Sequence, residues 1–182
     1  PRQGTTARIW IDRAEKAVHA LERMAPSTPE TAADSAAQST AEQASVVLDT
    51  MRRLGGQVVA VTTALGHADA PGLDEESQRL QELARSYPDD PSTVQSAQAV
   101  ADRVAVRDRL RRARFELDGR LQSSALGLEG LVARVAEVRA ASHTVGQIDP
   151  SADDLEALNA EVEGLRIGLR DVEQVAQRAL NT

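Results

Sequence analysis

Apolar residues near the end of the chain recur at alternating intervals of three and four, and this pattern constrains the fold more than any other feature. Such spacing places the side chains on one stripe of an α-helix, as in coiled coils and antiparallel bundles. A continuous apolar stripe is stable in water only when it is covered, so the segment requires a helical partner. The stripe consists of Leu155, Leu158, Val162, Leu165, Leu169, Val172, Ala176 and Ala179.

A partner with the same period lies just upstream, in residues 117–145, and it ends within residues 143–150. Those eight residues include Gly146 and Pro150, which end one helix and start the next. We therefore expect the two segments to form an antiparallel hairpin. The upstream stripe consists of Leu117, Leu121, Leu128, Leu131, Val135, Val138 and Val145.

Three further helices precede this hairpin. Thr28 with Pro29 predicts the start of the second, Asp74 the N-cap of the third and Ser92 the start of the fourth. Gly55 and Gly56 each cost a helix about 1 kcal/mol, but the stripe keeps its phase across them, which favours one continuous helix. The predicted helices span residues 6–24, 29–65, 75–86, 92–143 and 151–180, in one elongated helical domain over residues 1–182.

The apolar stripe of the fourth segment changes phase near Arg107 and Arg111. Such a slip indicates that a long helix turns different faces to different partners. We therefore predict an all-α, elongated antiparallel bundle, or coiled-coil rod. The first, second, fourth and fifth helices make one end, and the second, third and fourth make the other. We place the change between them near Met51 and Arg107.

Composition excludes several classes of protein. There are no cysteines, which excludes disulfides and Cys-based metal sites. Only Trp10, Tyr87 and Phe115 are aromatic, so the core must consist of aliphatic residues and alanine. The net charge of −7 argues against binding to nucleic acid or to an anionic membrane. No apolar run is long enough to span a bilayer, so we expect no direct membrane insertion.

No motif indicates catalysis, a cofactor or a metal site. Glu15 and His19 lie one turn apart, but no Glu-x-x-His pair occurs, as a helical di-iron site would need. Paired carboxylates such as Asp89 and Asp90 lie at predicted helix starts, where capping explains them. We therefore expect no catalytic, cofactor-binding or metal-binding residues, and hence no enzyme.

Arginines on the fourth predicted helix are the most unusual feature. In one interpretation they bind an acidic protein partner, and in the other they form ion pairs with acids of the third helix and its loops. The candidate partner-binding residues are Arg103, Arg107, Arg111 and Arg114.

These observations favour a non-catalytic helical scaffold or protein–protein interaction module. The alternative is a helical sensor or ligand-binding domain of a signalling protein; a membrane-remodelling hairpin is disfavoured because residues 6–24 are only slightly basic. We expect a protein partner, and homo-oligomers remain open. Because the chain begins at Pro1 without an initiator Met, we expect it to be part of a larger protein. The absence of a signal-peptide pattern favours a cytoplasmic location without deciding the compartment.

Overall fold

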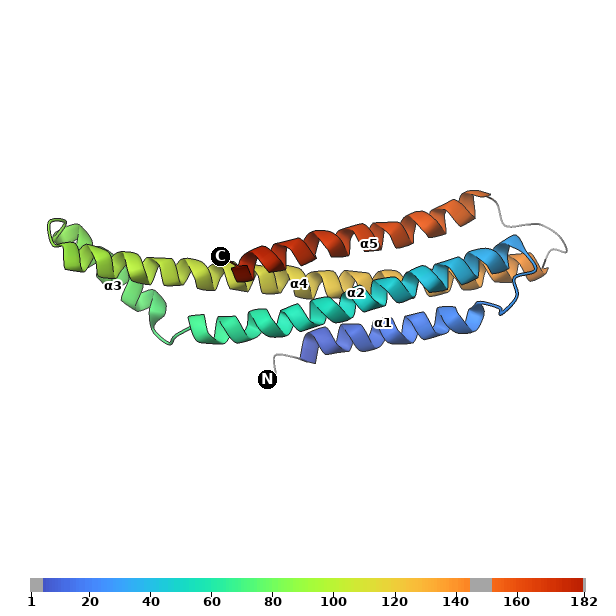
Figure 1. The fold of residues 1–182 in the computed structure, drawn as a ribbon, viewed down its shortest axis with the longest axis horizontal. Helices are drawn as coiled ribbons and strands as arrows, with labels where there is room; N and C mark the ends of the chain where they lie inside the picture. The colour runs from blue at the N-terminus through green and yellow to red at the C-terminus, as the bar shows by residue number, and fades with distance from the viewer. Residues whose placement is uncertain (1–4, 145–151, 182) are drawn as a thin grey trace.

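The computed structural model describes residues 5–144 and 152–181, and these form five helices joined by short connections, with no strand (Figure 1). The predicted number of helices is confirmed, and the predicted bounds differ by three residues or fewer. The helices are α1 (Thr5–Met24), α2 (Ala32–Ala68), α3 (Leu73–Ser86), α4 (Pro91–Thr144) and α5 (Ala152–Asn181).

The helices form an elongated antiparallel bundle around α4, as predicted (Figure 1). The longest helix, α4, contacts each of the other four. At one end α1, α2 and α5 surround it, and at the other α2 gives way to α3. The predicted three-helix end is wrong in one respect: among the described residues α3 contacts only α4 and not α2, so the tip of this end is a hairpin of two helices.

The core confirms the stripes read from the sequence. Leu121 and Leu128 of α4, Met51 of α2 and Leu169 of α5 are fully buried in one continuous apolar cluster. The stripe weakens toward the tip, where Val94 is 43% exposed. A pair of helices can cover only one side of each member, which explains the gradient in burial.

Two predicted helix starts are wrong. Helix α2 begins at Ala32 rather than at Pro29, because the Thr31 hydroxyl accepts a hydrogen bond from the backbone N–H of Asp34 at 3.1 Å. Helix α3 begins before Asp74, because Gly72 adopts a left-handed conformation (φ 77°) that favours glycine. The Asp74 carboxylate is therefore available for another contact.

The four-helix section also extends further along α2 than expected. We placed its end near Met51, but α1 still lines a shared groove with Val59 and Thr63. Gly55 permits this contact, because a Cβ atom there would lie 2.6 Å from Cδ1 of Ile11 in α1. The pair of glycines in α2 does not interrupt the helix, as predicted.

Several predictions lie outside the described residues. These are the turn at residues 145–150, the stripe residue Val145, and the side chains of Leu155 and Ala176. In the described part of the chain, no helix combines the length and the hydropathy needed to cross a bilayer.

We predict that two glycines of α4 respond oppositely to alanine. At Gly119 nothing lies within 4 Å of an added Cβ, so Gly119→Ala should stabilise the protein by up to about 1 kcal/mol through helix propensity. At Gly127 an added Cβ would lie 2.7 Å from Cδ2 and 3.3 Å from Cγ of Leu165 in α5. Overpacking costs about 1–3 kcal/mol, so Gly127→Ala should lower the melting temperature. Thermal unfolding followed by circular dichroism measures both, and a rise for Gly127→Ala would contradict the close packing of α4 and α5.

Candidate functional site

The two-helix hairpin of α3 and α4 is held at its base by one buried arginine. The Arg107 side chain is only 5% exposed, and its two terminal nitrogens donate hydrogen bonds to the Asp74 carboxylate at 2.7 and 2.8 Å. Its Nε donates to Asp108 at 3.0 Å. The guanidinium thus engages two carboxylates, one on each side of its Nη2 nitrogen, and α3 is fastened to α4 at its first turn.

This pair alters the protonation of both groups. Hydrogen bonding to Arg107 holds the pKa of the Asp74 carboxyl below its ordinary value, against a smaller opposing effect of burial. The pKa of Arg107 is raised, chiefly by the hydrogen bonds that it donates to Asp74. The ion pair therefore persists throughout the neutral range.

The four predicted arginines have different surroundings. Arg111 forms an ion pair with Asp69, in the connection between α2 and α3, at 2.9 Å. Arg114 lies 3.7 Å from Asp118 of its own helix. Arg103 is exposed and has no ion pair among the described residues. For Arg107 and Arg111 the structure favours pairing inside the chain, because their guanidinium groups already engage acids of α3 and its loop.

A groove runs between α3 and α4 beyond Arg107. Its floor is formed by the small residues Ala84, Ala97 and Ala101, and Arg85 and Val94 stand at its rims. The groove has a volume of about 310 Å³ and shares Val94 and Gln98 with a second depression of about 670 Å³ at the tip. Apolar side chains along this hairpin, such as Leu83, remain exposed.

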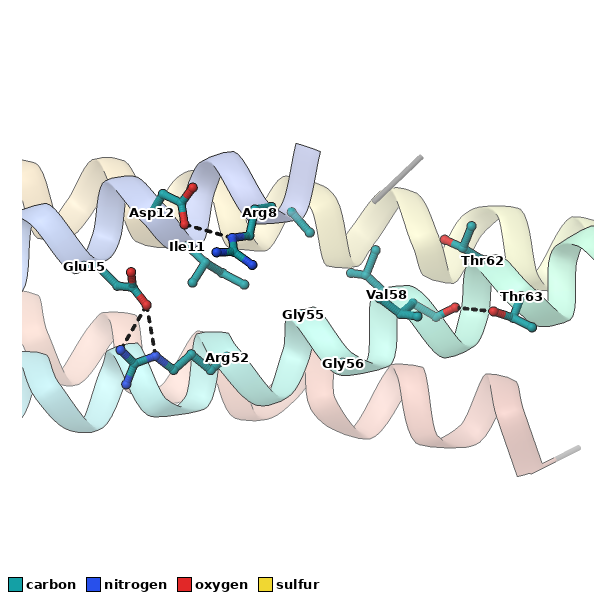
Figure 2. Close-up of a pocket in the computed structure, with 12 residues that line it drawn as sticks. Arg8, Ile11, Asp12, Glu15, Arg52, Gly55, Gly56, Val58, Thr62 and Thr63 are labelled. Atoms are coloured by element: carbon teal, nitrogen blue, oxygen red, sulfur yellow. Dashed lines mark hydrogen bonds and ion pairs between the residues drawn. The ribbon is translucent and has the colours of Figure 1, made fainter. Parts of the chain in front are cut away.

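Another groove lies between α1 and α2, with a volume of about 540 Å³ (Figure 2). Ile11, Gly55 and Val58 form apolar walls. An ion pair between Glu15 and Arg52 spans the two helices at 3.0 Å along one edge. The charged groups of this groove are thus paired with each other, as Figure 2 shows.

No arrangement of reactive groups accompanies either groove. In the described part of the chain, no group of three His, Asp or Glu side chains could hold a metal ion. His19, one turn from Glu15, instead forms a hydrogen bond with Glu22, at 3.0 Å on the surface. Burial raises the pKa of the Asp118 carboxyl, but the charged group that lies beside it is Arg114, which cannot act as a nucleophile or base at neutral pH.

Comparison with known proteins finds no matching family model, no matching curated relative and no matching solved structure.

Sequence analysis predicted, as one of two interpretations, ion pairs between the arginines of α4 and acids of the third helix and its loops, but it did not identify which acid Arg107 meets. Asp74 was also predicted as the N-cap of that helix, and it is one of several acids there that the arginines could have met. The available signal was the spacing: Asp74 and Leu73 lie on the same side of α3 as Ser77, and this side faces α4. An arginine placed where the apolar stripe of α4 slips was the matching signal on the other helix.

We predict different effects from reversing the charge of two arginines one turn apart. Arg107→Glu should detach α3, because it places a carboxylate against Asp74 and Asp108 in a buried position. Arg103→Glu makes the same change in charge at an exposed position and should alter the free energy of unfolding by about 0.5 kcal/mol or less. Hydrogen exchange of the α3 amides provides the measurement. Equal protection of α3 in the two variants would show that Arg107 does not hold the hairpin together.

Acidification should loosen the same contact. The folded-state pKa of Asp74 is lowered, so the ion pair contributes in full above the unfolded value of about 4 and is lost as the pH falls through the lowered pKa. Amide exchange of α3, corrected for its intrinsic pH dependence, should therefore accelerate below about pH 4. Asp74→Asn removes the titrating group and should give α3 exchange that varies less with pH over this interval. An unchanged acid response in this variant would assign the effect to other carboxylates.

Proposed function

We propose that this chain is a non-catalytic helical interaction module, in which a four-helix body presents the α3–α4 hairpin to a protein partner. The observation that carries this proposal is the incomplete burial of the hairpin. Leu83 and Val94 are each 43% exposed, whereas the four stripe leucines of α4 in the four-helix section are fully buried. These leucines are Leu117, Leu121, Leu128 and Leu131. A helical stripe that is half covered is completed by another helix.

The unpaired charges of the hairpin support the same proposal. Arg103 and Arg112 have no carboxylate partner among the described residues, and neither Glu82 nor Asp89 has an arginine partner there. Charges of this kind at the margin of an apolar groove steer association and set the orientation of the partner. We therefore expect the partner to bind at the groove of the hairpin and not at Arg107, which is already paired with Asp74 and Asp108.

The alternative, a sensor or ligand-binding domain, is favoured by the groove between α1 and α2. Its volume of about 540 Å³ is within the range of small-molecule sites. The buried Oγ1 of Thr62 has no hydrogen-bond partner and could orient a ligand there. The charges at its rim, Arg8 with Asp12 and Arg52 with Glu15, are already paired, so we rank this function second.

Site-specific photocrosslinking in the native cells tests the interaction module. A photoreactive residue replaces Gln98 in the hairpin groove or, as a matched control, Gln122; both glutamines are exposed positions of α4. We expect protein adducts from position 98 and none from position 122, with mass spectrometry of the adduct identifying the partner. The absence of adducts at position 98, or equal adducts at both positions, would contradict binding at the hairpin.

A further inference from the structure

We infer that the partner of the α3–α4 hairpin is the same hairpin of a second copy of this chain, joined to it by a two-fold axis. This inference deepens the proposed function and rests on it. Two antiparallel hairpins that cover each other form a four-helix bundle, which buries all of their apolar stripes. A two-fold contact of this type requires a surface that is complementary to itself.

The outer stripe of α4 has the required symmetry. Val94, Gln98, Ala101 and Ala105 are spaced by four, three and four residues, which reads the same in both directions. An axis that crosses α4 midway between Gln98 and Ala101 sets each Gln98 opposite the Ala101 of the second copy. It also sets each Val94 opposite the other Ala105. A large side chain therefore meets a small one at both ends of the overlap, and the alanines permit close approach.

The charges fit this same axis. Asp74 lies opposite Arg107, and α3 runs antiparallel to α4, so Arg85, eleven residues further along α3, is level with about residue 96 of α4. The axis then sets Arg85 beside Asp102 of the second copy, and Asp102 has no arginine partner within the described chain. It also brings Arg112 to the tip of the other hairpin, which carries the exposed Asp89.

The size of the overlap is compatible with a weak dimer. Twenty residues of helix span about 30 Å, and two helices side by side present a face about 20 Å wide, or about 600 Å². Stable interfaces bury about 800 Å² on each partner. The overlap ends near Arg112, where the four-helix body begins, so the two bodies point away from each other. We therefore expect a dimer that dissociates on dilution.

Sedimentation velocity between about 1 μM and about 1 mM, the range of weak association, tests the dimer. Arg85→Asp and Asp102→Arg should each weaken self-association at least about tenfold, because each sets like charges opposite one another twice in the symmetric contact. Mixing the two variants should restore dimers of about the wild-type affinity, since both contacts then pair opposite charges. Arg79→Asp, at an exposed position of α3 outside the groove, is the control and should associate like wild type.

Each result decides the inference. Restoration in the mixture, with unchanged melting of both variants, supports it, because a defect inside one chain would not be corrected by a second. A wild-type chain that stays monomeric throughout overturns it, as does a mixture that fails to dimerise. The crosslinking experiment tests the proposed function separately. Adducts from position 98 to a different polypeptide would support the interaction module but rule out the second copy as its partner. The absence of adducts would contradict the interaction module itself.

Discussion

Burial of one leucine stripe on α4 is the interaction on which the whole bundle depends. Within the described ranges this helix is the one element that contacts all the others, and Leu117, Leu121, Leu128 and Leu131 are fully buried along it. Each buried leucine contributes about 1.5–3 kcal/mol to the stability of the fold. Because α1, α2 and α5 all pack against the stripe, its burial stabilises all three contacts. Because aromatic residues are almost absent, the helices can approach closely, and glycines deepen the contact where Leu165 meets Gly127. The rod shape follows, since such a core grows in length rather than in width.

Where this leucine stripe ends, an ion pair takes the place of apolar packing. Beyond Leu110 the apolar face turns away from the body of the bundle, and at that level α4 carries Arg107 instead of a leucine. A buried arginine is stable only when its donors are engaged, and Asp74 and Asp108 supply the acceptors. The ion pair has a fixed geometry and therefore sets the orientation of α3 on α4. Apolar contacts between so few residues would leave that orientation loosely defined. The hairpin therefore keeps its shape without the third and fourth helices that stabilise the rest of the rod.

The fold was largely predictable from the sequence, because helix stripes with a period of three and four are local signals that survive in the folded state. The start of α2 was missed because Thr28 and Thr31 are equally good caps in isolation, and the choice depends on which hydroxyl reaches a free N–H, here that of Asp34. The extent of α1 along α2 could not be predicted, since it depends on Ile11 meeting Gly55 across two helices. The same limit applied to the candidate site: the arginines were identifiable as unusual, but which acid each one meets is a property of the register between α3 and α4.

The two grooves differ in how their charges are satisfied, and this difference is the reason for proposing a protein partner at the α3–α4 hairpin rather than at α1 and α2. Between α1 and α2, Glu15 and Arg52 neutralise each other, so an incoming group would have to displace an existing ion pair. Along the α3–α4 hairpin, Arg85 and Asp102 stand at the margins of an apolar floor without such a pair. In a chain whose apolar stripes are otherwise buried, the places where apolar side chains stay exposed or charges stay unpaired are usually functional surfaces. The hairpin is such a place. Its exposed apolar residues reduce the stability of the isolated chain, and the second hairpin that we propose would cover them and remove this cost.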